Sequence, residues 1–171
     1  METWDALRAR RNVRQYADRP IDPAHLDRIL EAGRRAPSSM NEQRWDLVLS
    51  TDREQLRELS RVWRGAGHVA TSAATVTLLT TVTEDAGLRA SIEFDAGQVT
   101  MSMMIAAADL GIGSCHSVVA DQELARKILG HPNELRGSML ISFGYPADQP
   151  LRPIRDPNRR PFDQVVHRGH W

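Results

Sequence analysis

Residues 91–110 (SIEFDAGQVTMSMMIAAADL) constrain the fold most, because they predict a long helix that is apolar on nearly every side. The segment has no proline and a single glycine, and its polar residues make it too polar to span a bilayer. We therefore expect a central helix with a sheet on one face and another layer, such as a second copy of the chain, on the other. The apolar side chains divide into three sets, Ile92, Val99, Met103, Ala106 and Leu110, then Phe94, Met101, Ile105 and Ala108, then Ala96, Met104 and Ala107.

Composition limits the class of protein. A chain of 171 residues favours one domain, covering residues 1–171. Basic and acidic residues number 22 each, so net charge gives no argument for nucleic acid or an anionic membrane as a partner. Cys115 is the single cysteine, which excludes an intrachain disulfide and suits a reducing compartment. The N-terminal residues METWDALRARR lack the apolar core of a signal peptide, so we expect a cytoplasmic protein.

Local patterns predict alternating helices and strands in a three-layer arrangement. We expect helices at residues 3–10 with Trp4 and Leu7 inward, at 22–36 with Asp22 as cap, from Thr51, and at 121–130. Strands are expected at residues 45–50, 74–82, 114–119 and 138–145, the second of them buried on both faces. Residues 146–171, rich in proline and arginine, predict an extended tail that packs on the sheet or on a partner subunit.

Three stretches could carry chemistry. Residues 8–16 (RARRNVRQY) place four arginines and Asn12 where a helix gives way to a loop. A dianionic phosphate needs several such fork-shaped donors, although arginines at a helix end can also simply offset the helix dipole. Residues 36–45 (APSSMNEQRW) gather hydroxyls and amides that can bind a polar heterocycle edge, or that only make turns. Residues 110–119 (LGIGSCHSVV) turn from the central helix into a strand, the reverse of the order in a Rossmann fingerprint.

Together these stretches resemble the FMN-dependent nitroreductase family, in particular its short, single-domain members. The family pattern Arg-Arg-Ser-x-Arg-x-Phe/Tyr corresponds to residues 10–16, and Ala-Pro-Ser-x-x-Asn-x-Gln-Pro-Trp to residues 36–45. Its Leu-Gly-x-Gly-[ST]-Cys turn corresponds to residues 110–115. Its Gly-Tyr-Pro-Ala, Arg-Arg-Pro and closing His-x-x-x-Trp correspond to residues 144–147, 159–161 and 167–171. The matches run in order over nearly the whole chain.

The resemblance implies an α+β, three-layer α/β/α fold with a central mixed sheet flanked by helices, and a homodimer with FMN at the interface. Each flavin would contact both subunits. It would meet an N-terminal cluster, the backbone around the strand after the central helix and the tail, and it would meet the loop of the other subunit. The residues implied are Arg10, Arg11, Asn12 and Arg14 at the phosphate and ribityl chain, Pro37, Ser38, Ser39 and Asn41 from the loop, His116, Val118 and Val119 along the strand, and Arg159 and Arg160 from the tail.

The implied activity is that of an oxidoreductase which takes hydride from NAD(P)H onto flavin N5 and passes electrons to an electron-poor acceptor, such as a nitroaromatic or quinone. We expect no catalytic side chain and no metal, because the cofactor carries the difficult step. A non-catalytic protein that stores FMN or senses redox state is the alternative, motivated by Ser117-Val118-Val119-Ala120, where the family has a glycine-containing segment. A nucleic-acid-binding protein is a weaker third possibility.

Several single residues need separate treatment. Cys115 and His116 are adjacent on a predicted strand and so point to opposite faces, which argues against a nucleophile–base pair. His68 and His131 fall in predicted loops and are expected to be solvated. Asp95 lies on the central helix and needs a partner if it is buried, either an arginine of another subunit or a group near the flavin.

Overall fold

The computed structural model describes all residues from Met1 to Trp171 and contains one four-stranded sheet in the order β1-β2-β4-β3. Every pair of neighbouring strands is antiparallel, so the expected mixed sheet is corrected; the one parallel pairing is an isolated bridge between Asn12 and Ser114. The strand directions were not predictable from the sequence, because they are set by pairings between segments far apart in the chain. The strands are β1 Trp45–Ser50, β2 Ala74–Thr81, β3 Gly113–Val118 and β4 Leu135–Gly144.

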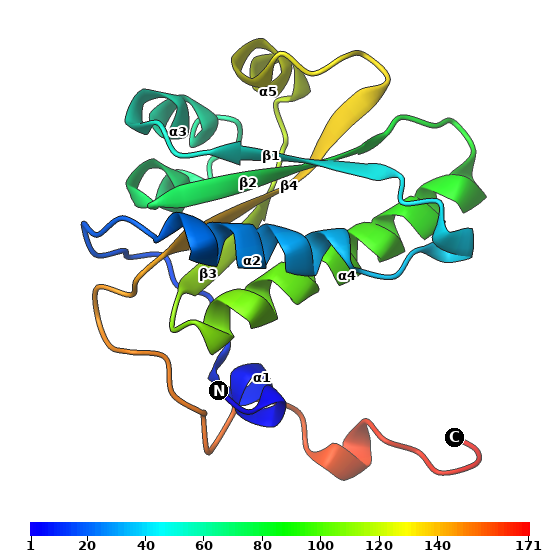
Figure 1. Ribbon diagram of the computed structural model, residues 1–171. Helices are drawn as coiled ribbons and strands as arrows, with labels where there is room; N and C mark the ends of the chain where they lie inside the picture. The colour runs from blue at the N-terminus through cyan, green and yellow to red at the C-terminus, as the bar shows by residue number, and fades with distance from the viewer.

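Helices cover both faces of this sheet, which gives the expected α+β, three-layer arrangement (Figure 1). On one face a core of 15 buried residues joins the sheet to α2 (Pro23–Arg34) and α4 (Ala86–Asp109). On the other face a core of eight buried residues joins it to α3 (Arg53–Leu59) and α5 (Gln122–Leu129). The remaining elements are α1 Thr3–Ala9 and three short 3-10 turns, η1 Ser39–Asn41, η2 Gly67–Thr71 and η3 Phe162–Gln164. No helix is long and apolar enough to cross a bilayer.

The central helix α4 is longer than the sequence pattern predicted and begins where the Asp85 carboxylate accepts the Leu88 N–H at 2.9 Å. Ile92, Val99 and Met103 are buried against the sheet. Phe94 and Met101, by contrast, are 69% and 43% exposed. One apolar strip of the helix therefore remains uncovered in the single chain.

Two details of the predicted helices are wrong. In α1 the buried residues are Ala6 and Ala9, whereas Trp4 is 68% exposed and Leu7 is also exposed. Small side chains let this short helix pack closely, which leaves the larger ones outside. The cap of α3 is Asp52, which accepts the Gln55 N–H at 2.9 Å, and not Thr51.

The first part of the tail packs on the N-terminal segment and not on the sheet. Leu151 joins Ala9, Val13, Tyr16 and Ala108 in a small buried cluster. The Ile154 N–H donates to the Arg8 carbonyl at 3.1 Å, which places the tail beside α1. Residues 155–171 are exposed throughout, and Figure 1 shows them leaving the body of the domain past α1.

Candidate functional site

The arginine-rich segment after α1 is held against the sheet by its backbone. The Val13 N–H donates to the Ser114 carbonyl at 2.9 Å, and Asn12 forms the bridge to Ser114. A Cβ at Gly113 would lie 2.7 Å from the Val13 side chain, so the glycine is needed for this close approach. The segment is thus fixed beside the start of β3 and its long side chains remain free to extend.

The cationic side chains of this segment differ in their partners. Arg11 is committed to Asp148, with 2.9 Å between Nη2 and Oδ1, and it also donates to the Gln149 carbonyl. Arg10 contacts the Asn12 Oδ1 at 3.2 Å, and neither Arg10 nor Arg14 forms an ion pair with a carboxylate. Two uncompensated guanidinium groups therefore lie near β3, while the third is neutralised by the tail.

Their field reaches the neighbouring strand. Burial, followed by Arg10 and Arg14, lowers the pKa of His116. Burial raises the pKa of the Cys115 thiol, against a smaller opposing effect of the same two arginines. His116 is accordingly held neutral at pH 7, and Cys115 is held as a thiol. A positive potential with no carboxylate to cancel it is suited to an anionic ligand.

Strand β3 lies at the edge of the sheet, and its outer side is bridged only at Ser114. His116 and Val118 are exposed, whereas Cys115 is fully buried, which confirms that Cys115 and His116 point to opposite faces. Val119 does not share this exposure, since its side chain is buried in the core beside α5 and its carbonyl accepts from Gln122 at 2.7 Å. The backbone edge between Ser114 and Val119 is therefore the accessible part of the predicted strand site.

The loop of residues 36–44 is tied to the central helix. The Ser39 N–H donates to the Asp95 Oδ2 at 3.0 Å, and the Ser91 hydroxyl donates to the Ser39 Oγ at 2.8 Å. Gln98 donates to both the Asp95 carboxylate and the Pro37 carbonyl, at 3.2 and 3.4 Å. The partner that buried Asp95 required is thus this loop, and no arginine of the same chain contacts it.

The same loop has an unusual backbone. Met40, Asn41 and Gln43 have φ values of 53°, 58° and 51°, in the left-handed region that non-glycine residues rarely adopt. Ser38 supports the conformation by accepting the Gln43 N–H at 3.0 Å. Arg44, which replaces the family's proline, is bound to Glu42 at 2.6 Å and is not a free cation. Strained backbone held by specific anchors is typical of ligand-binding loops.

The predicted site residues do not meet within one chain. The loop is anchored at Asp95, whereas the arginine segment packs against Ala108. The rise of an α-helix puts these two positions roughly 20 Å apart along the axis of α4. Arg159 and Arg160 hydrogen-bond to neither group, since they donate to tail carbonyls, those of Asn158 and Gln164.

Sequence reasoning missed one part of the site. His68, expected to be solvated, is only 7% exposed, and it lines a cavity of about 550 Å³ that also includes Arg14. His131, also expected in solvent, is buried as well. Buried His68 is hydrogen-bonded to Ser142, a residue 74 positions further along the chain, so no local pattern could have revealed its environment. The remaining lining residues are Gln15, Tyr16, Gly65, Gly67 and Thr71.

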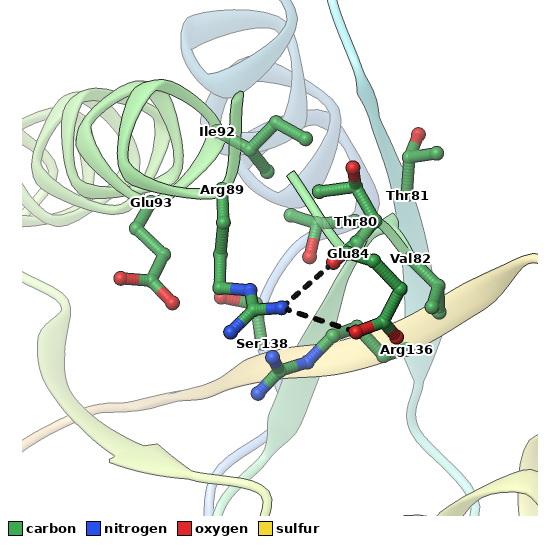
Figure 2. A pocket seen from close by; sticks show the side chains of 10 residues that line it. Thr80, Thr81, Val82, Glu84, Arg89, Ile92, Glu93, Arg136 and Ser138 are labelled. Carbon is green, nitrogen blue, oxygen red and sulfur yellow. Dashed lines mark hydrogen bonds and ion pairs between the residues drawn. The ribbon is translucent and has the colours of Figure 1, made fainter. Parts of the chain in front are cut away.

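A second cavity, of about 260 Å³, lies where β2 and β4 meet the start of α4 (Figure 2). Arg89 spans it, donating to the Thr83 carbonyl at 2.9 Å and lying 3.8 Å from the Glu84 carboxylate. None of the predicted site residues lines this cavity. The candidate site is therefore the region around Arg14 and β3, together with the loop at the other end of α4.

Comparison with known proteins decides the family. A sequence model of the nitroreductase family matches residues 7–66 and 59–145. The chain belongs to the nitroreductase family. Among curated members, it is 29% identical over 179 residues to a protein of Archaeoglobus fulgidus named as an NADH dehydrogenase/NAD(P)H nitroreductase, covering 99% of both chains. It is 28% identical over 200 residues to an NADH dehydrogenase of Thermus thermophilus, covering 97% of this chain and 95% of that one.

Solved structures agree on the nitroreductase fold. An FMN-dependent nitroreductase of Clostridium difficile superposes with a TM-score of 0.84 at 22% identity, covering 97% of this chain and 98% of the other. At this identity the likeness establishes the fold only. The three layers and the long central helix of this nitroreductase-family chain are thus shared with distant relatives, and the activity must be argued from its own residues.

Proposed function

We propose that this protein is an FMN-dependent oxidoreductase that takes hydride from NAD(P)H onto flavin N5 and passes electrons to an electron-poor acceptor. It would act in the cytoplasm as a homodimer with FMN at the interface. The observation that carries the proposal is the pair of uncompensated guanidinium groups, Arg10 and Arg14, beside the open edge of β3 in a nitroreductase-family chain. Relatives named FMN reductase and NADPH-dependent oxidoreductase, from Bacillus subtilis and Staphylococcus saprophyticus, support this class of chemistry.

The residues present fit FMN. Arg10 and Arg14 offer forked donors for a phosphate, with Asn12 beside them. The unpaired backbone of β3 near His116 and Val118 offers donors and acceptors for the polar edge of a flavin ring. Arg11 fits less well, because Asp148 already neutralises it. FMN supplies the two-electron redox chemistry when bound, and the protein supplies binding, orientation and electrostatics.

A second copy of the chain would complete the site. The loop residues Pro37, Ser38, Ser39 and Asn41 lie at the opposite end of α4 from Arg14, so they reach a ligand bound there only from another subunit. The uncovered strip of α4, with Phe94, Met101 and the partly exposed Ile105, is a suitable surface for an antiparallel, isologous pairing of two central helices. Such a pairing places the loop of one copy beside the arginines of the other.

The tail supports the same assembly. Phe162, Val165 and Trp171 are exposed, and Trp171 packs against the His167 ring of the same tail, with 4.2 Å between ring centroids. A partner subunit would bury them, and would bring Arg159 and Arg160 to a phosphate site that they do not approach within one chain.

The protein groups have limited roles in the proposed reaction. Arg10 and Arg14 bind and neutralise the phosphate, and the loop orients the ring and excludes water from one side of it. No side chain has to act as a nucleophile. Cys115 is unsuited to that role, because it is buried and its thiol pKa is raised by burial.

An absorbance spectrum of the purified protein tests the proposal. We expect yellow protein that releases FMN on denaturation, and anaerobic NADH or NADPH should bleach the bound flavin faster than free FMN. Colourless protein that fails to bind added FMN at micromolar concentrations would contradict the proposal. Bound FMN that no nicotinamide reduces would favour a storage or redox-sensing protein, the alternative motivated by residues 117–120.

A further inference from the structure

The cavity where β2 and β4 meet the start of α4 has no part in the proposed function. Its volume is about 260 Å³, and none of the residues assigned to FMN lines it. An engineered protein cavity of roughly 150 Å³ holds a benzene molecule. The space is therefore sufficient for a compound built on a single ring with a small substituent.

An irregularity in β4 decides which side chains face this cavity. The pairing register shifts between Leu78 and Leu79 of β2, where Ser138 is an extra residue on β4. Because side chains alternate between the two faces of a sheet, one extra residue moves those beyond it to the other face. Arg136 consequently lies opposite Thr80 and shares with it the face that carries α4.

The bulge is held in place by a side chain that follows β3. The Gly137 N–H donates to the Gln122 Oε1 at 2.8 Å, and the Gln122 Nε2 donates to the Gly137 carbonyl at 2.7 Å. A Cβ at Gly137 would lie 2.9 Å from the Val119 side chain, so the close approach requires glycine. The backbone that aims Arg136 is thus fixed by the fold.

Four donor side chains line the cavity, and they have little to bind within the chain. Thr80 is only 4% exposed, yet its hydroxyl is accessible and makes no hydrogen bond, and the Ser138 hydroxyl makes none either. Arg136 has no carboxylate partner. Arg89 lies 3.8 Å from the carboxylate of Glu84, whose side chain is 98% exposed. Figure 2 shows Arg89 reaching from α4 toward β4, on which Arg136 and Ser138 lie.

These donors indicate the chemistry of the ligand. A carboxylate only accepts hydrogen bonds, offers about four lone-pair sites and pairs well with guanidinium groups. Glu84 and Glu93 also border the cavity and are exposed, so a single negative charge is favoured over the double charge of a phosphate. Ile92, which is 5% exposed, gives the carbon part of the ligand an apolar contact.

We propose that this cavity is a second ligand site, which binds a small organic carboxylate between Arg89 and Arg136. The hydroxyls of Thr80 and Ser138 donate to the same carboxylate, and the carbon part is no larger than about one ring. The site shares no residue with the FMN site, so this inference goes beyond the proposed function and does not depend on it.

The test is a calorimetric titration of the purified protein with benzoate, for which we expect a Kd of about 1 mM or tighter. Benzamide, which has nearly the same shape and no charge, should bind at least about tenfold more weakly, and so should inorganic phosphate. Arg136→Gln should lose at least about tenfold in benzoate affinity. Thr80→Val, which keeps the shape of the side chain and removes the hydroxyl, should lose roughly as much.

Arg57→Gln is the matched control, because Arg57 is an exposed arginine on α3, against the other face of the sheet, and it should bind benzoate like the wild type. Amide NMR locates the ligand, since benzoate should shift the resonances of Thr80 and Arg136. A wild type that gives no saturable binding, or an Arg136→Gln variant with undiminished affinity, would overturn the inference. Tighter binding of phosphate than of benzoate would overturn the assignment of a carboxylate.

Discussion

The arginine segment and the loop of residues 36–44 form the two halves of the candidate site, and they are built in opposite ways. The arginine segment has ordinary backbone docked on β3, and its feature of interest is charge that nothing compensates. The loop carries little free charge, and its feature of interest is a strained backbone held by buried Asp95. One half is incomplete without an anion, whereas the other keeps its shape without any ligand.

This difference suggests how the cost of assembling the site is divided. Left-handed backbone at three non-glycine residues costs on the order of 1–3 kcal/mol each. The anchors from Ser91, Asp95 and Gln98 offset that cost during folding. The repulsion among the arginines is offset only on binding. The loop therefore contributes pre-organised shape, and the arginines contribute most of the affinity.

The largest effect is expected when dimerisation is prevented, because the arginine segment of one copy and the loop of the other can then no longer meet. Phe94→Asp places a charge in the uncovered strip of α4, and we expect a monomer that no longer retains FMN. Because Phe94 is exposed in the single chain, the substitution should change the intrinsic unfolding free energy of the monomer by no more than about 0.5 kcal/mol. Light scattering and the flavin absorbance of the same sample measure both effects.

Leu49→Asp serves as the control, since Leu49 is an exposed apolar residue on β1, at the opposite edge of the sheet from β3. It should stay dimeric and yellow. A Phe94→Asp variant that remains a dimer with bound flavin would show that the interface lies elsewhere.

The next largest effect tests the charged half. The double variant Arg10→Ala, Arg14→Ala should bind FMN at least about 100-fold more weakly, because each charge-assisted contact is worth roughly 1.5–3 kcal/mol. Riboflavin, which lacks the phosphate, should lose much less affinity. Titration by flavin fluorescence measures both ligands. Arg34→Ala removes an arginine that is paired with Glu31 on α2 and should change nothing; equal losses for FMN and riboflavin would argue against a phosphate site.

Loosening the loop of residues 36–44 should weaken FMN binding less than removing the arginines does, and should lower the stability of the protein more. Asp95→Ala removes the acceptor of the Ser39 N–H and leaves that donor without its partner, at a cost of about 1–3 kcal/mol in unfolding free energy. FMN affinity should fall by roughly tenfold, since the loop then pays its ordering cost on binding. Urea unfolding and fluorescence titration measure the two quantities. Asp27→Ala, an exposed change on α2, is the control, and unaltered stability in Asp95→Ala would mean that the loop needs no anchor.

Elements with local signals were predictable from sequence. Asp22 followed by Pro23 marked the start of α2, and the Asp22 carboxylate does accept the Ala24 N–H at 2.8 Å. The β-branched run at residues 74–82 became β2, buried on both faces, within one residue of its predicted end. In each case the residues that specify the structure are neighbours in the chain.

Features that depend on distant partners were not predictable. His68 is hydrogen-bonded to Ser142, Arg11 is neutralised by Asp148, and Asp95 accepts from Ser39. The antiparallel sheet is of the same kind, since strand order is set by packing of the whole chain. The uncovered strip on α4 was anticipated because a helix that is apolar all round must be covered on several sides.

The smallest effect on FMN affinity is expected for Arg11, which differs from Arg10 and Arg14 in having a carboxylate partner. Arg11 lies between Arg10 and Arg14 in the pattern that pointed to a phosphate site, yet its guanidinium is bound to the Asp148 carboxylate, which lowers the pKa of that carboxyl. Because exposed ion pairs contribute little, Arg11→Ala should leave the thermal midpoint almost unchanged, and FMN affinity should stay within about twofold of wild type. The same titration used for Arg10 and Arg14 measures it. A loss of FMN affinity as large as that of the Arg10→Ala, Arg14→Ala variant would mean that Arg11 leaves Asp148 and binds the phosphate. An ion pair within the single chain would then not show which arginines bind the ligand.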